Sequence, residues 1–221
     1  MKNHYISEYL KLKCSGQLQE LFSQSSNPWK EVTESMSAYK NVKEFIDVKD
    51  GSITNIFIGD GSLCLTGALF SFITKGQSVS IDPKINMNKV AEWQSREKVK
   101  RLLKIDSKFQ NIPLPWDPIK KSNCNLILVH AHVNLEELVS HFPNWNMLFT
   151  NPCCNPFEQT FSVQFQKEND ISVLRAGYDK FNLSPKNMVF VYKNNKSEGK
   201  KPYQLDKECV NNGGRKRLEK R

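Results

Sequence analysis

The chain has 221 residues and a formal net charge of +9, and its 38% hydrophobic and 25% charged residues are typical of one globular α/β domain with appendages. No apolar run approaches the ~18 residues of a membrane span, which excludes an integral membrane protein. The six cysteines form no C-x-x-C pair, and the N-terminus has no long apolar segment, so we expect a protein of a reducing compartment, cytoplasmic or nuclear.

Residues 1–50 contain two helical patterns. Apolar residues from Tyr9 to Phe22 recur at roughly helical spacing, and a second repeat runs from Trp29 to Phe45. The polar segment SQSSNP separates them. We therefore expect an N-terminal helical extension whose helices each lay one apolar face on a core.

From Asn55 the pattern changes to short apolar runs that alternate with helical stretches, which predicts βαβ units and a parallel sheet over residues 51–194. The expected strands are Asn55–Ile58, Ser78–Ile81, Asn125–His130 and Asn146–Thr150. The expected helices are Leu63–Thr74, Asn88–Lys104 and Asn134–His141. The runs ISVLRAGY and NMVFVYKN predict a terminal strand pair, and residues 195–221 are polar and lysine-rich, which predicts a basic disordered tail.

A glycine turn follows the first expected strand. Gly59 and Gly61 permit a tight turn and let a ligand approach the N–H groups that begin the next helix. The third glycine of the dinucleotide fingerprint is absent, because the next glycine after Ser62 is Gly67, and no Gly-Lys-Ser/Thr follows. Pyrophosphate binding is therefore disfavoured. Asp60, between the two glycines, has two open roles: contact with an amino group of a ligand, or capping of the following helix.

An acidic residue ends the second expected strand, about twenty residues after the glycine turn. Asp82 lies where a carboxylate commonly accepts hydrogen bonds from ribose hydroxyls. A Gly-x-Gly turn with such an acid and no phosphate loop suits a nucleoside ligand without pyrophosphate. S-adenosylmethionine is the commonest cofactor of that kind.

In this order and spacing, the motifs resemble those of the class I S-adenosylmethionine-dependent methyltransferases. IFIGDGS is similar to their first glycine motif, SIDP to their ribose-binding acid, LILVHAH to their fourth strand, and MLFTNPCC to a later segment that meets the substrate. The resemblance spans Asn55 to Asn194. It implies an α/β, Rossmann-like, doubly wound and mostly parallel seven-stranded sheet with one antiparallel strand. The cofactor-binding residues that it implies are Gly59, Asp60, Gly61, Ser62 and Asp82.

Polar residues also stand at the ends of two further expected strands. The carboxyl ends of parallel strands meet at one crevice, so these residues should lie near the same ligand. Asn151 and Pro152 match the start of the Asp/Asn-Pro-Pro-aromatic motif of methyltransferases that act on exocyclic amines. This similarity implies that they hold the methyl acceptor, with His130 as a proton acceptor. Cys153–Cys154 replace the second proline and the aromatic residue, and Phe157 is a candidate substitute for the stacking ring.

Other interpretations of this segment stay open. One is a metal site. His130 and His132 fall at i, i+2 on one face of a strand, and a thiolate of Cys153 or Cys154, which follow the next strand, could complete the ligand set. Zinc sites usually show tighter spacing, so no metal is predicted. A cysteine nucleophile with a histidine base is a second alternative. In a third, the two prolines shape a loop and the cysteines pack beneath it.

The positive charge gathers in two places, the stretch from Arg96 to Lys104 and the C-terminal GGRKRLEKR. Such charge favours a nucleic-acid partner, RNA above DNA, and no membrane partner. Two hypotheses follow. The first is a methyltransferase that uses S-adenosylmethionine on RNA or another nucleic acid. The alternative is a catalytically inactive module of the same fold that binds nucleic acid or serves as a scaffold; a dinucleotide-dependent oxidoreductase comes third.

Overall fold

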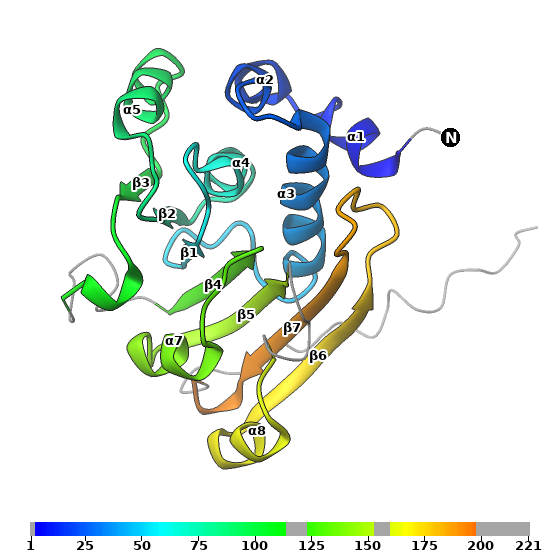
Figure 1. Ribbon diagram of the computed structural model, residues 1–221, viewed down its shortest axis with the longest axis vertical. Coiled ribbons are helices and arrows are strands. Elements are labelled where there is room, and N and C mark those ends of the chain that lie inside the picture. Colours follow the sequence, from blue (N-terminus) through cyan, green and yellow to red (C-terminus); the bar gives the residue numbers. More distant parts are fainter. Residues whose placement is uncertain (1–2, 114–122, 153–159, 198–221) are drawn as a thin grey trace, which may run out of the picture.

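The computed structural model describes residues 3–113, 123–152 and 160–197, and its centre is a seven-stranded sheet of order β3-β2-β1-β4-β5-β7-β6 (Figure 1). The strands are β1 (Thr54–Ile58), β2 (Gln77–Ile81), β3 (Leu102–Ile105), β4 (Cys124–Val129), β5 (Trp145–Asn151), β6 (Ile171–Tyr178) and β7 (Met188–Asn194). Strands β1 to β5 are mutually parallel, and β7 runs antiparallel between β5 and β6. The expected mostly parallel, seven-stranded sheet with one antiparallel strand is therefore confirmed.

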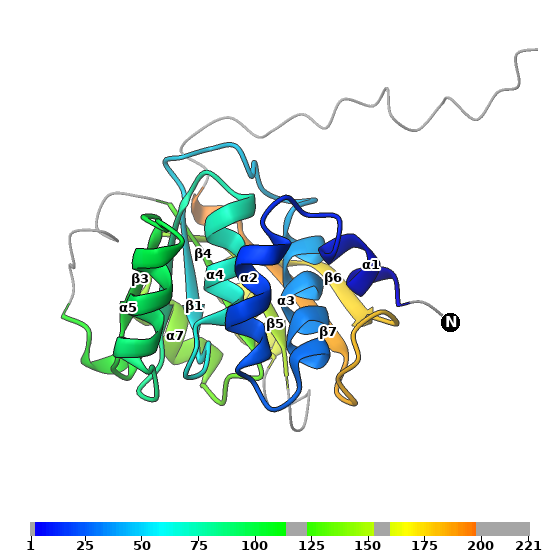
Figure 2. The same ribbon diagram turned by 90° about the horizontal axis from the view of Figure 1, so that it is seen from above.

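Helices cover both faces of the sheet, as expected of a doubly wound fold. They are α1 (His4–Tyr9), α2 (Ser15–Ser23), α3 (Pro28–Val42), α4 (Leu65–Ile73), α5 (Met87–Arg96), α7 (Leu135–His141) and α8 (Val163–Asn169). Helices α1 to α5 lie on one face, whereas α7 and α8 lie on the other (Figures 1 and 2). Within the described ranges, no helix combines the length and the apolar character that a membrane crossing needs.

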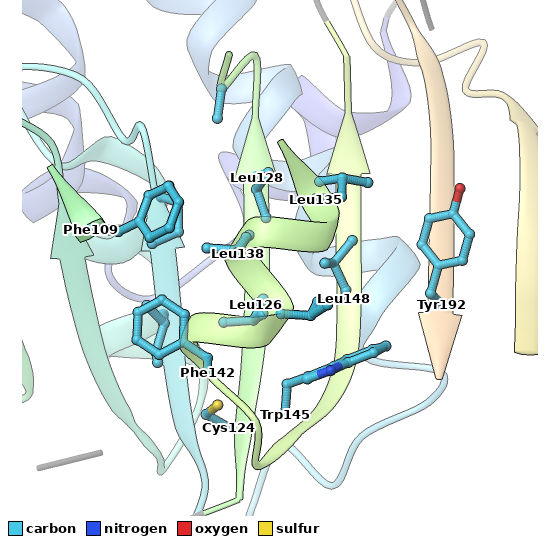
Figure 3. Packing of buried hydrophobic residues seen from close by; sticks show 14 of the residues in the cluster. Phe109, Cys124, Leu126, Leu128, Leu135, Leu138, Phe142, Trp145, Leu148 and Tyr192 are labelled. Carbon is cyan, nitrogen blue, oxygen red and sulfur yellow. The ribbon is translucent and has the colours of Figure 1, made fainter. Parts of the chain in front are cut away.

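The alternation of side chains along each strand supplies both apolar layers. On β4, Leu126 and Leu128 point toward α7 and pack with Leu138 and Phe142 (Figure 3). Ile127 points to the opposite face and joins the cluster beneath α3 and α4. Because successive residues of a strand face opposite sides, a strand covered on both faces reads as a continuous apolar run, as LILV does.

The expected helix Asn88–Lys104 is wrong in its second half. Helix α5 ends at Arg96, Lys98 adopts a left-handed conformation with φ +56°, and Leu102–Ile105 pair with β2 as the edge strand β3. A four-residue edge strand with one buried residue has too few positions to show a two-residue period. In the sequence, Leu102 and Leu103 therefore fit the helical repeat of the preceding residues, and the pattern predicts a helix where the structure has a strand.

The N-terminal extension also differs in detail from the prediction. Its first helical pattern is split into α1 and α2, and the ends of the second repeat, Trp29 and Phe45, are exposed. Helix α3 packs directly on the sheet, where Ala38 and Val42 share an apolar cluster with Phe57 of β1. The extension and the sheet thus have a common core. Most of the predicted tail, residues 198–221, lies outside the described residues.

Candidate functional site

The glycine turn predicted after β1 has the backbone conformation that glycine permits. Gly59 and Gly61 have φ values of +71° and +69°. A Cβ at Gly59 would lie 2.8 Å from the Cβ of Ala131, so the missing side chain lets the turn pass close to the segment after β4. A Cβ at Gly61 would meet no described atom within 4 Å. The space over Gly61 is therefore open to a ligand.

Asp82 lies beside this turn at the end of β2, and its side chain is directed toward it. Its Oδ2 accepts a hydrogen bond from the backbone N–H of Gly61 at 3.0 Å, and its Oδ1 accepts one from Lys84 at 2.7 Å. The residue is buried. Each carboxylate oxygen keeps lone-pair capacity for one further hydrogen bond. Asp82 is not among the lining residues of the cavities described below, so its contact with a ribose stays a prediction.

Of the two roles expected for Asp60, the structure shows capping of the following helix. Its Oδ1 accepts from the backbone N–H of Thr66 at 3.0 Å, and its Oδ2 accepts from Gly67 at 2.9 Å and from the Ser80 hydroxyl at 2.6 Å. Burial raises the pKa of Asp60 to about 6, although these hydrogen bonds stabilise the ionised form. Contact of Asp60 with an amino group of a ligand stays a prediction.

The raised pKa of Asp60 has a consequence for stability. Because the native carboxyl keeps its proton to a higher pH than an unfolded one, its contribution to the free energy of unfolding is largest below about pH 4 and is lost as the pH rises through about 6. In urea titrations at several pH values, the stability of Asp60→Asn relative to the unchanged protein should improve over this window, by at most ~3 kcal/mol. If the difference in stability between Asp60→Asn and the unchanged protein did not vary with pH, the raised pKa of Asp60 would be contradicted.

Two cavities lie at the carboxyl edge of the parallel strands and share Gly59 and His132 in their linings. The larger cavity, of about 460 Å³, extends from the glycine turn to α3 and to the β6–β7 loop. Its charged and polar lining residues include Lys30, Glu31, Glu34, Asp60, His130, Ser184 and Lys186. The smaller cavity, of about 280 Å³, has a largely apolar wall formed by Ile58, Ile81, Pro83, Phe109, Ala131 and Val133.

His130 lies where β4 ends, in a left-handed conformation with φ +57° that is uncommon for a residue with a side chain. Its backbone N–H donates to the carbonyl of Asn151 at 2.9 Å. Its Nε2 lies 2.5 Å from Oε1 of Glu34 and 3.2 Å from Oγ of Ser184. The ring thus joins β4 to α3 and to the β6–β7 loop.

Glu34 is the functional candidate that the sequence patterns give no signal for. It lies on α3, 96 residues before His130, and its side chain is only 2% exposed. Lys30, one turn earlier, places its Nζ 2.7 Å from the same Oε1. Burial raises the pKa of Glu34, but the hydrogen bonds and charges of His130 and Lys30 outweigh it and lower that pKa overall.

The side chain of Asn151 is engaged inside the protein. Its Nδ2 donates to the carbonyls of Lys186 and Met188 at 2.9 and 2.8 Å, and its Oδ1 accepts from Asn182 at 3.1 Å. These bonds hold the β6–β7 loop on the end of β5. Asn151 and the buried Pro152 are not among the lining residues of the larger cavity, so their predicted contact with an acceptor stays a prediction.

Several predicted features of this edge lie outside the described residues, namely Cys153, Cys154 and Phe157. Within the described ranges, no three His, Cys, Asp or Glu side chains are grouped to hold a metal ion. The described cysteines, Cys14, Cys64 and Cys124, are buried, and burial raises the pKa of each thiol. None of these three therefore has the environment of a reactive thiolate.

No family model and no curated protein matches the chain. Solved structures are similar to it in fold. A presumed RNA methyltransferase from Pyrococcus horikoshii has a TM-score of 0.53 at 11% identity, over 83% of this chain and 98% of that one. An S-adenosylmethionine-dependent methyltransferase from Aquifex aeolicus has 0.47 at 17%, over 71% and 88%. An rRNA methylase from Streptococcus thermophilus has 0.48 at 10%, over 71% and 93%. The chain has the Rossmann-like fold of class I methyltransferases.

Proposed function

We propose that the protein is an S-adenosylmethionine-dependent methyltransferase. The observation that carries the proposal is the open space over Gly61, which lies beside the Asp82 carboxylate. Gly61 lines the larger cavity, and Gly59 lines both cavities at the carboxyl edge of the sheet, where ligands of doubly wound folds bind. A nucleoside with a short polar extension suits this layout better than a dinucleotide, because the chain lacks a phosphate loop.

The two cavities differ in chemistry in a way that matches the two ends of such a cofactor. The apolar wall of the smaller cavity suits a flat base, with Ile81 and Phe109 on its surface. In the larger cavity, Lys186 suits a carboxylate and Glu31 suits a cationic group. Bound S-adenosylmethionine supplies an electrophilic methyl group, and the residues around the larger cavity would position the acceptor and exclude water.

Nucleic acid, with RNA favoured, is the substrate class that the charge supports. The chain carries a net charge of +9 and ends in GGRKRLEKR, and such segments bind phosphate backbones without sequence preference. The structural neighbour from Pyrococcus horikoshii is described as a presumed RNA methyltransferase, which is consistent with this class.

Calorimetric titration with S-adenosylmethionine and with NAD tests the proposal. We expect binding of the first and none of the second, and about 10- to 100-fold weaker binding in Asp82→Ala, because a charged hydrogen-bond acceptor is lost. Glu168→Ala, which removes an exposed carboxylate on α8, is the matched control. Thermal unfolding of both variants separates lost binding from lost folding.

A second arm addresses the reaction. Purified protein with S-adenosylmethionine labelled in the methyl group should transfer label to RNA from cells and not to protein. Binding without transfer to either would instead support the inactive module. If neither S-adenosylmethionine nor NAD bound, the proposed function would be wrong.

A further inference from the structure

A further cavity, of about 400 Å³, lies between α3 and the carboxyl end of β6. Its lining residues include Asn41, Arg175, Tyr178 and Lys180, and it shares none with the two cavities described above. Strand β6 runs parallel to β5, because each is antiparallel to β7. The end of β6 therefore lies at the same edge of the sheet as the glycine turn.

Two cationic side chains line this cavity. Arg175 donates from Nη1 to Oδ1 of Asn41 at 2.9 Å, and its Nη2 pairs with the carboxylate of Glu44. A guanidinium has five N–H donors in a planar fork, so these contacts leave donor capacity for a phosphate group. Lys180 is exposed, and its Nζ lies 5.0 Å from the centroid of the Phe181 ring. Both cations are therefore placed to contact an anion in the cavity.

Tyr178 adds an aromatic ring beside these charges. Its exposed fraction, 79%, is the highest among the large apolar and aromatic residues that the structure describes. Exposed rings next to cationic side chains are typical of surfaces that bind single-stranded nucleic acid, because bases stack on the rings while the cations contact phosphates. In a duplex the faces of the bases are already stacked on one another, so the ring favours a single strand.

The β6–β7 loop, residues 179–187, joins this cavity to the larger one beside the glycine turn. It lies alongside α3 (Figure 2). Lys180 lines the further cavity and Lys186 lines the larger one, and both are exposed. Asp179, the acidic residue of the loop, is buried. The exposed charge of the loop is therefore positive, which suits a phosphate backbone.

The distance between the two cavities suits a short stretch of RNA. Glu34 lines one and Asn41 the other, two turns apart on the same face of α3, or about 10 Å along the helix axis. Stacked nucleotides are about 3.4 Å apart, so about three of them cover this distance. The loop between the cavities presents Leu183, 50% exposed, whose N–H donates to Oγ1 of Thr33 at 3.0 Å. Trp29, 45% exposed, lies one turn before Thr33 and offers a second aromatic ring.

We propose that Arg175, Tyr178 and Lys180 form an RNA surface that binds the single strand next to the nucleotide to be methylated. One base stacks on Tyr178, Arg175 and Lys180 hold phosphates, and the strand crosses the β6–β7 loop to the larger cavity. The inference deepens the proposed function and rests on it, because it assigns the binding of the RNA substrate. Stacking is tolerant of sequence, so this surface accepts any base beside the target.

Fluorescence anisotropy with a labelled single-stranded RNA of about sixteen nucleotides, without S-adenosylmethionine, tests the aromatic part of the RNA surface. We expect Tyr178→Ala to weaken binding about 10-fold and Tyr178→Phe, which keeps the ring, to leave it unchanged. Val163→Ala, which truncates an exposed apolar side chain on α8, is the matched control. The basic C-terminal segment is present in every variant, so its contribution is the same in each.

The same strand annealed to its complement is the second arm of this experiment. The duplex should bind the unchanged protein more weakly than the single strand does, and Tyr178→Ala should not change its affinity. Equal effects of Tyr178→Ala and Val163→Ala, or equal affinity for the single strand and the duplex, would overturn the RNA surface.

Charge variants test the phosphate contacts, and two of them have opposite expected effects. Glu44→Gln should tighten RNA binding about 2- to 5-fold, because it removes the carboxylate that pairs with Arg175. Glu168→Gln makes the same change of charge on α8 and should have a smaller effect. Lys180→Gln should weaken binding and lower the slope of log affinity against log salt by about one, whereas Lys167→Gln on α8 should not. Equal results for the members of either pair would contradict the phosphate contacts.

Labelled methyl transfer separates this inference from the proposed function. Tyr178→Ala should raise KM for RNA about 10-fold and leave kcat and the calorimetric binding of S-adenosylmethionine unchanged. If the variants changed RNA binding as expected but the protein bound no S-adenosylmethionine, the proposed function would be wrong and the RNA surface would stand. If S-adenosylmethionine bound but neither Tyr178→Ala nor Glu44→Gln changed the affinity for RNA, the RNA surface alone would be overturned.

Discussion

Gly67→Ala should lower the free energy of unfolding by about 3 kcal/mol. A Cβ at this position would lie 2.2 Å from Oγ of Ser80, 2.9 Å from Oδ2 of Asp60 and 3.1 Å from a methyl group of Leu102. The helix cannot keep this contact with β2 and must move, and overpacking of this kind costs typically ~1–3 kcal/mol. Displacement of Ser80 also breaks its hydrogen bond to Asp60, worth about another 1 kcal/mol.

Urea unfolding followed by circular dichroism measures this effect. Gly16→Ala is the matched control, since Gly16 also lies in a helix, α2, and a Cβ there would meet no described atom within 4 Å. That variant should be more stable by ~0.5–1 kcal/mol, because alanine favours the helix. Equal effects at the two glycines would show that α4 is free to shift, contrary to the geometry.

The close approach at Gly67 explains how the chain packs α4, the helix after β1, on the sheet without the third glycine of the dinucleotide fingerprint. In dinucleotide-binding folds the third glycine serves mainly for close packing of the helix on the strand. Here the glycine turn contains only Gly59 and Gly61, and Gly67, one helical turn later than the fingerprint, makes the close contact. A spacing rule alone leaves Gly67 as an ordinary core residue. The packing function is nevertheless present, carried by a different position of α4.

The fold was predictable because its signals are local and repeated. Runs such as Ile56–Ile58 are apolar throughout, because helices cover both faces of the sheet, and helical stretches alternate with them. The failures have local causes too. Strand β3 is too short to show its own period, and the break between α1 and α2 falls inside a continuing apolar repeat. Boundaries of this kind depend on tertiary pairing that no short window contains.

The candidate site was predictable only where it follows strand ends. Gly59, Gly61 and Asp82 meet because parallel strands end at one edge. Glu34 gave no signal, since a glutamate on an amphipathic helix is indistinguishable from a solvated one until the helix is placed on the sheet. Asn151 is the opposite case. Its position in a motif at a strand end predicts contact with a ligand, but its side chain forms hydrogen bonds with the β6–β7 loop. The roles of Glu34 and Asn151 both depend on side-chain partners that are distant in the sequence.

One buried carboxylate connects the N-terminal helices to the sheet. Oδ2 of Asp179, at the start of the β6–β7 loop, accepts from the hydroxyl of Tyr5 at 2.7 Å, from the hydroxyl of Ser37 at 2.6 Å and from Nδ2 of Asn41 at 3.2 Å. Its Oδ1 accepts from the N–H of Phe181 at 3.1 Å. Burial, and then the hydrogen bond to Asp179, raise the pKa of Tyr5. The same loop carries Ser184, and α3 carries Glu34, so this network also sets the spacing around His130.

Asp179→Ala should lower the free energy of unfolding by ~3–5 kcal/mol, because it leaves the hydroxyl groups of Tyr5 and Ser37 buried without this acceptor, whereas Nδ2 of Asn41 keeps its bond to the carbonyl of Ser37. Tyr5→Phe, which removes one donor and keeps the carboxylate bound by the others, should cost only ~1–2 kcal/mol. Urea titration measures both, and hydrogen exchange should show α1 and α3 opening before the sheet in Asp179→Ala. Unchanged protection of α3 would mean that its apolar face alone holds it in place. Loss of protection confined to these helices would instead show that the wall of the larger cavity is held by a polar network separable from the core.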